Sequence, residues 1–85
     1  MKILHIIRDM EEALPLQVAG EQRGQGYQVT LLLLHDAVLR RVSFPGPVLA
    51  CEDDLTARGV EGRYPAVDYR GVVQAILDHD KVISW

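Results

Sequence analysis

The sequence predicts an α/β protein: a small three-layer α/β/α sandwich with a mostly parallel sheet of four or five strands. Two observations support this class. Short, nearly continuous apolar runs occur at residues 3–7 and 29–34, as expected of strands that are covered on both faces. Segments with helical periodicity lie between and after these runs, and this alternation is typical of parallel sheets with right-handed crossovers.

The first half of the chain contains the signals for two helices and a third strand. One helix is expected to begin near Leu14, because Pro15 is tolerated only in a first turn, and to end at the glycines at 24 and 26. Asp36 is placed to cap a short helix after the second strand. A Pro-Gly-Pro turn then leads into a β-prone run at 48–50.

The second half predicts two more helices and a final strand. A brief helix is expected at about 53–57, followed by a very short strand at 66–67. Asp68 is the natural N-cap of the next helix, which has the clearest periodicity in the chain. One continuous apolar face is predicted there from Tyr69, Val72, Val73, Ile76 and Leu77. The tail at 81–85 is expected to form the last strand.

Size and composition predict one domain, 1–85, that associates with other subunits. The chain has 85 residues, 48% of them hydrophobic, and a single cysteine that rules out an internal disulfide. Tyr64, Tyr69 and Trp85 are candidate contacts between subunits, and Trp85 is expected to be ordered because it closes the last strand. A lone cysteine, an N-terminal apolar run too short for a signal peptide and no stretch of membrane-spanning length predict a cytoplasmic protein.

Charge and motif content exclude several function classes. The net charge is −3, and Arg40, Arg41 and Arg63 read as scattered surface charges, so direct nucleic-acid binding is not expected. No glycine-rich phosphate loop follows the first strand, and the three histidines and one cysteine lack metal-ligand spacing. We therefore expect neither a nucleotide, nor another cofactor, nor a metal ion.

Cys51 is the most informative residue of the chain. It stands directly after the third predicted strand and directly before a helix, which places it at the carboxyl edge, where open α/β sheets bind ligands. A helix N-terminus stabilises a thiolate, whereas the acidic triplet at 52–54 opposes it. Two interpretations stay open: a reactive thiol, or a small side chain that only packs.

His35 is the second candidate site residue. It follows the second strand and, if the first three strands are adjacent and parallel, it lies with Asp9 and Cys51 around one cleft. A histidine next to a cysteine can activate the thiol as a general base. The alternative is that His35 is only a surface or capping group.

Three segments together resemble the DsrH/TusB family of sulfur-relay proteins. They are the run LLLLHDAV at 31–38, the pattern VxAxEDDLxARG at 48–59, and Asp68-Tyr69 followed by Val73, His79 and the final Trp85. The resemblance spans nearly the whole chain and implies a flavodoxin-like α/β/α fold. It also implies one subunit of a DsrEFH or TusBCD assembly, with DsrE/DsrF-like (TusD/TusC-like) partners, which passes persulfide sulfur between donor and acceptor proteins. The destination is 2-thiolation of the tRNA wobble uridine or sulfur oxidation.

Cys51 departs from the usual DsrH/TusB pattern, which commonly has an aliphatic residue there. The related DsrE/TusD subunits carry their sulfur-accepting cysteine ahead of a similar helix, with Arg-Gly at the separation that Arg58-Gly59 has from Cys51. The resemblance therefore suggests a sulfurtransferase subunit with Cys51 as acceptor. Two alternatives stay open: a non-catalytic scaffold subunit of such a complex, and a small flavodoxin-like ligand-binding or regulatory domain.

Overall fold

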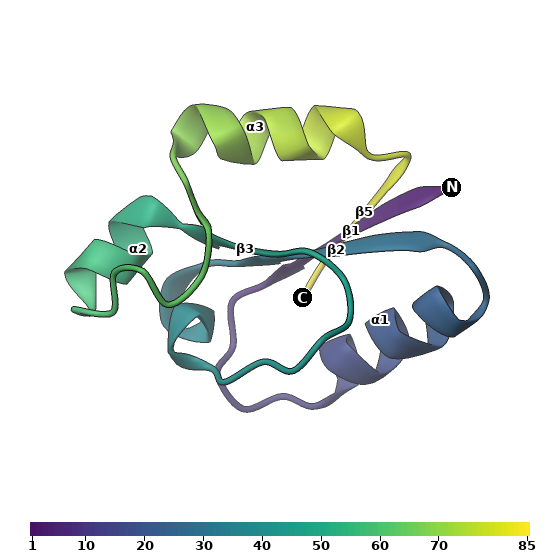
Figure 1. The fold of residues 1–85 in the computed structure, drawn as a ribbon, viewed down its shortest axis with the longest axis horizontal. Coiled ribbons are helices and arrows are strands. Elements are labelled where there is room, and N and C mark those ends of the chain that lie inside the picture. Colours follow the sequence, from purple (N-terminus) through teal and green to yellow (C-terminus); the bar gives the residue numbers. More distant parts are fainter.

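A computed structural model describes all residues, 1–85, and shows a five-stranded sheet in which every strand pairs in parallel with its neighbours (Figure 1). The strands are β1 (Lys2–Ile7), β2 (Gln28–Leu33), β3 (Val48–Cys51), β4 (Ala66–Val67) and β5 (Lys81–Ser84). The helices are α1 (Leu14–Gly24), the 3-10 helix η1 (His35–Leu39), α2 (Glu52–Ala57) and α3 (Tyr69–Asp78). The α/β class and the parallel sheet predicted from the sequence are confirmed.

The strand order is β4-β3-β2-β1-β5, which places the most apolar strands in the interior of the sheet. In β1, every residue from Ile3 to Ile7 is buried, and its partner β2 runs alongside from Gln28 to Leu33. A strand that helices cover on both faces favours apolar residues, and a polar side chain there needs hydrogen-bond partners, as His5 has in Gln22 and Trp85. The nearly continuous apolar runs are therefore a direct consequence of central position.

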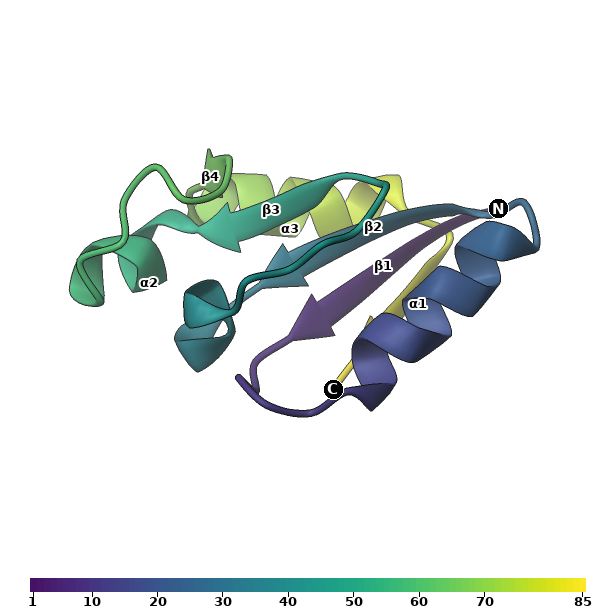
Figure 2. The same ribbon diagram turned by 60° about the horizontal axis from the view of Figure 1, so that its bottom comes forward.

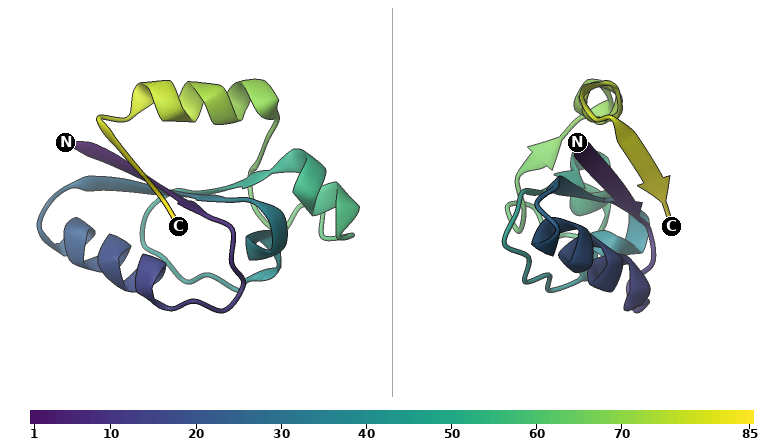
Figure 3. Two further views of the ribbon diagram at one scale, coloured as in Figure 1. Left: turned by 180° about the vertical axis from the view of Figure 1, so that it is seen from behind. Right: turned by 90° about the vertical axis from the view of Figure 1, so that its right-hand side faces the viewer.

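Helices cover both faces because the last crossover reverses direction. The connections from β1 through β4 step one way across the sheet, and α3 then carries the chain back past β1 to β5. A right-handed crossover that reverses direction emerges on the opposite face. Figures 1 and 3 show α1 on one face of the sheet and α3 on the other. The larger core cluster contains buried residues of α1, η1 and α2, and the smaller one contains Ala75 of α3.

The segment after β2 differs from the helix that the sequence predicts. It forms the 3-10 helix η1, and the Asp36 side chain makes no capping hydrogen bond. Instead, Asp36 accepts a hydrogen bond of 3.0 Å from Nε of Arg58. Only six residues, 34–39, separate β2 from the extended chain beyond η1, so a tight turn takes the place of an α-helix.

The orientation of α3 also differs from the prediction. Its N-cap is Asp68, as expected, and that carboxylate accepts a 2.8 Å hydrogen bond from the Gly71 N–H. The apolar face, however, does not form the core: Tyr69 is 81% exposed and Leu77 is 73% exposed, while Ala75 is buried. Of the predicted apolar face, Val72 packs against the smaller core cluster. The helix approaches the sheet closely at its start, where a Cβ added to Gly71 would stand 2.9 Å from Cβ of Val67.

A substitution pair tests this close approach. Gly71→Ala is expected to lower the free energy of unfolding by about 1–3 kcal/mol, because the backbone of α3 must move away from Val67. Gly20→Ala is the matched control in α1, since nothing lies within 4 Å of its added methyl group and helix propensity favours alanine. Urea unfolding should show a stabilisation of about 0.5–1 kcal/mol for the control. Equal effects of both changes would contradict the packing of α3 described here.

Candidate functional site

The carboxyl edge of the sheet brings the predicted site residues to one side of the molecule. β1, β2 and β3 are adjacent and parallel, so the residues that follow them leave the sheet at the same edge (Figure 2). Asp9 follows β1, His35 follows β2, and Cys51 is the last residue of β3. This placement agrees with the sequence-based expectation that strands one to three are adjacent.

Cys51 lies between two neighbouring strands, β3 and β4, whose outgoing connections lead to opposite faces of the sheet. It is a free, half-buried cysteine, and its register partner in β4 is Val67. From β3 the chain passes into α2, whose Leu55 packs in the larger core cluster, whereas from β4 it passes into α3 on the opposite face. The carboxyl ends of two strands whose connections lead to opposite faces form the usual ligand position of open α/β sheets. Cys51 occupies that position.

Helix α2, which begins directly after Cys51, is short and acidic at its start. It has six residues and carries Glu52, Asp53 and Asp54 in its first turn. The three residues that follow Cys51 in the chain are therefore all carboxylates.

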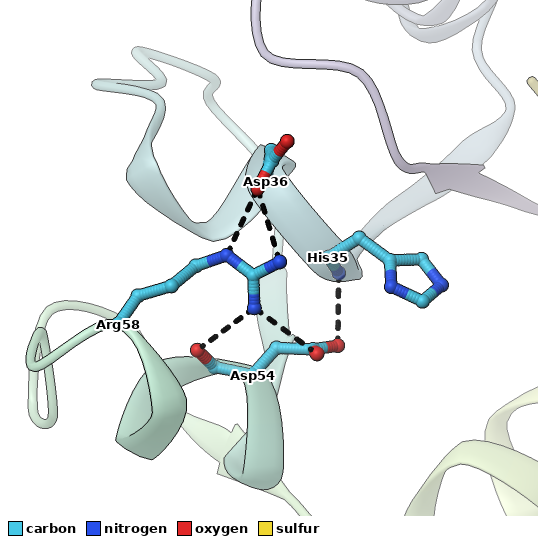
Figure 4. A network of polar contacts seen from close by, with 4 residues as sticks. All are labelled: His35, Asp36, Asp54 and Arg58. Atoms are coloured by element: carbon cyan, nitrogen blue, oxygen red, sulfur yellow. Dashed lines mark hydrogen bonds and ion pairs between the residues drawn. The ribbon is translucent and has the colours of Figure 1, made fainter.

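A polar network joins η1 to α2 (Figure 4). The Cys51 side chain contacts one of its members, Asp54. The backbone N–H of His35 donates a 2.8 Å hydrogen bond to Oδ2 of Asp54. Arg58 pairs with both Asp54, at 3.4 Å, and Asp36, at 3.0 Å. His35 has a φ of 52°, a left-handed conformation that is uncommon outside glycine. The bond to Asp54 holds the His35 N–H in this turn.

The contacts of Asp54 shift its pKa. Burial raises the pKa, but the hydrogen bond from the His35 N–H, the contact with the Cys51 thiol and the electrostatic interactions with His35 and Arg58 together lower it by more. The net result is a pKa below the usual value of an aspartate. Asp54 therefore stays ionised in the folded state, with the Cys51 thiol beside it.

The lowered pKa of Asp54 predicts a loss of stability in acid. A carboxyl group whose folded-state pKa is depressed contributes stability above the unfolded pKa, and this contribution disappears as the pH falls through the folded pKa. Urea unfolding at about pH 7, 4 and 3 should show a smaller acid loss in Asp54→Asn than in wild type. Asp53→Asn is the control, because Asp53 is exposed and makes no hydrogen bond or ion pair. An unchanged acid loss in Asp54→Asn would contradict the role of this network.

The His35 side chain points away from Asp54 and Arg58 (Figure 4). Its imidazole forms no hydrogen bond with Cys51, so the structure brings the two segments together at one edge without joining the two side chains. The pairing of Cys51 with His35 stays a prediction. Sequence reasoning missed the ion pairs of Arg58 with Asp36 and Asp54, although the i, i+4 spacing of Asp54 and Arg58 is a signal for one of them.

The other residues of the carboxyl edge are engaged in local structure. Asp9 accepts hydrogen bonds from the N–H groups of Glu11 and Glu12, and these bonds hold its pKa below the usual value. Arg40 donates to the carbonyl of Asp9. None of the three surface depressions is lined by Asp9, His35 or Cys51. The largest, of about 460 Å³, lies at the amino end of β2 instead.

The C-terminal residue is fixed to the centre of the sheet. Trp85 Nε1 donates a 3.0 Å hydrogen bond to Nδ1 of the fully buried His5, and the two rings stack with centroids 6.0 Å apart. Since Nδ1 accepts, the proton of a neutral His5 sits on Nε2, which lies 2.6 Å from Oε1 of Gln22. Arg8 donates to the Trp85 carbonyl. Trp85 is therefore ordered, as the sequence predicts.

Comparison of the chain with known protein families, with curated proteins and with solved structures finds no match. No group of three or more His, Cys, Asp or Glu side chains is arranged to hold a metal ion. No helix is both long enough and apolar enough to cross a membrane. What the fold and the site define is a small parallel α/β domain with a free thiol at the carboxyl edge of its sheet.

Proposed function

We propose that this chain is a cytoplasmic subunit of a sulfur-relay system resembling DsrH/TusB, in which Cys51 accepts sulfur as a persulfide. The observation that carries the proposal is the position of Cys51, the only cysteine, at the carboxyl end of β3 beside β4. Two further features support it: the half-buried state of the thiol and the Arg58-Gly59 pair that ends α2, with Gly59 at a φ of 67°. The sulfur then serves either tRNA wobble-uridine thiolation or sulfur oxidation.

The proposed transfer is a thiol exchange reaction. The Cys51 thiolate attacks the outer sulfur of a persulfide on a donor protein. A new S–S bond forms on Cys51, the S–S bond of the donor breaks, and the donor leaves as a thiolate. Cys51 then carries the persulfide until the thiolate of a downstream protein takes the outer sulfur in the same way. No external oxidant or reductant is consumed.

The exposed apolar face of α3 supports a role inside a larger assembly. Tyr69, Val73, Ile76 and Leu77 are exposed along this helix, and Val82 of β5 is exposed as well. Large apolar side chains gathered on one face are typical of protein interfaces, with aromatic residues as anchors. Either copies of this chain or DsrE/DsrF-like (TusD/TusC-like) subunits would cover this face.

The assembly prediction is tested with a charge placed on α3. Wild-type protein is expected to form a dimer or larger oligomer in light scattering, alone or with its partner subunits. Leu77→Glu should shift it to monomer, because burying an unpaired carboxylate in an apolar interface costs several kcal/mol. Gln17→Glu adds the same charge on the exposed side of α1 and should leave the assembly unchanged. A wild-type monomer at micromolar concentration with every partner present would contradict the proposal.

A scaffold role is the second candidate, and two observations favour it: the apolar face of α3 is exposed, and none of the surface depressions is lined by Cys51. In this case another subunit carries the reactive cysteine. Omission of the chain from a reconstituted relay tests the subunit role that both candidates share: transfer should stop or slow strongly. Transfer at an unchanged rate would show that the chain is not part of the relay.

A further inference from the structure

Two arginines that are distant in the sequence meet at one surface depression. The depression has a volume of about 340 Å³ and is lined by Arg41, Val42, Ser43, Arg63 and Tyr64. The sequence suggests that Arg41 and Arg63 are dispersed surface charges, but the structure places both residues in the lining of one depression. This convergence comes from the connection between η1 and β3 meeting the connection between α2 and β4.

Three hydrogen bonds fix the two segments against each other. The Tyr64 hydroxyl donates to the carbonyl of Arg40 and accepts a 2.9 Å bond from the N–H of Val42, so it holds the backbone on both sides of Arg41. Arg63 NH1 donates a 3.1 Å bond to the carbonyl of Leu39. The depression is thus built by side chains of one segment that clamp the backbone of the other.

The donors around the depression have no acidic partner. The ion pairs of the structure are those of Arg58, and neither Arg41 nor Arg63 takes part in one. No carboxylate lines the depression, and Ser43 makes no hydrogen bond through its side chain. Guanidinium groups present planar forks of N–H donors that match tetrahedral oxyanions, and a serine hydroxyl adds a further donor.

We infer that this depression is a binding site for a phosphate-type dianion, either free or carried as a monoester on a small molecule. Arg41 and Arg63 supply the two positive charges, Ser43 supplies a neutral donor, and Tyr64 holds Arg41 in place. The site is separate from Cys51, which does not line it, and it does not depend on the proposed sulfur transfer.

Titration with inorganic phosphate, at constant ionic strength and followed by backbone amide shifts, tests the site. Saturable shifts centred on residues 41–43 and 63–64 are expected. Arg41→Gln and Arg63→Gln should each weaken binding about tenfold, the scale of one charge-assisted hydrogen bond. Arg70→Gln is the matched control, because it removes the same charge from an exposed arginine of α3 and should change affinity less than about twofold.

Tyr64→Phe distinguishes a site with a fixed backbone geometry from unspecific attraction of phosphate by positive charge. It leaves the net charge unchanged but removes the hydroxyl that holds the backbone around Arg41, so binding should weaken several-fold. A parallel titration with phenyl phosphate distinguishes the source: tighter binding than inorganic phosphate indicates a monoester, and equal binding indicates the free ion. Shifts that do not saturate, or equal effects of Arg41→Gln and Arg70→Gln, would overturn the inference.

Discussion

Replacement of Trp85 by alanine is expected to lower the free energy of unfolding by about 3 kcal/mol. The indole packs against the main core cluster and bonds to His5, which is fully buried. Its removal takes away this packing and the donor to Nδ1 of the buried His5, and a buried acceptor that loses its partner costs about 1–3 kcal/mol. Urea unfolding followed by circular dichroism measures the loss.

Two further variants separate the components of this effect. Trp85→Phe keeps most of the packing but loses the N–H donor, so a loss of about 1–2 kcal/mol is expected. Tyr69→Ala removes an aromatic side chain that is 81% exposed and should change stability by no more than about 0.5 kcal/mol. Equal losses for Trp85→Ala and Tyr69→Ala would contradict the bonding of the C-terminus to His5.

The sheet could be predicted from the sequence because its central strands are runs of apolar residues that are consecutive in the chain. A strand covered on both faces is mostly apolar, and the stretch from Ile3 to Ile7 shows this in the printed sequence, with His5 as its one polar residue. The N-cap of α3 at Asp68 is similarly local, since donor and acceptor are three residues apart. The alternation of such signals is enough to define the α/β class.

Features that depend on three-dimensional contact could not be predicted. The hydrophobic pattern of α3 indicates which residues are apolar, but not that Ala75 would be buried and Leu77 exposed, nor that Gly71 would approach Val67 so closely. The bond between His5 and Trp85 joins residues 80 positions apart. No periodicity in the sequence encodes such a pairing.

The candidate site likewise has some features that the local sequence predicts and others that depend on three-dimensional contact. Strand order alone places His35 and Cys51 at one edge of the sheet, because each follows a parallel strand. The direction of the His35 imidazole depends on the left-handed conformation of His35, which the hydrogen bond to Asp54 stabilises. A glycine would indicate such a conformation in the sequence, but the residue here is a histidine. Position could therefore be predicted, and side-chain orientation could not.

The second large effect is expected from Cys51→Ser, which should abolish sulfur acceptance by this chain. Serine preserves the size of the side chain but cannot form a persulfide. A relay reconstituted with Cys51→Ser should therefore lose transfer through this subunit, while its circular dichroism spectrum and its oligomeric state stay those of wild type. Transfer at an unchanged rate would contradict the acceptor role and favour the scaffold role instead.

Intact-mass analysis after incubation with a persulfide-carrying donor protein tests the acceptor role of Cys51 most directly. Wild-type protein is expected to gain the mass of one sulfur atom, and the gain should disappear on treatment with a reductant, because a persulfide is reducible. Cys51→Ser should show no gain under the same conditions. A wild-type chain that gains no sulfur from a donor able to load another acceptor would contradict the proposed acceptor role of Cys51.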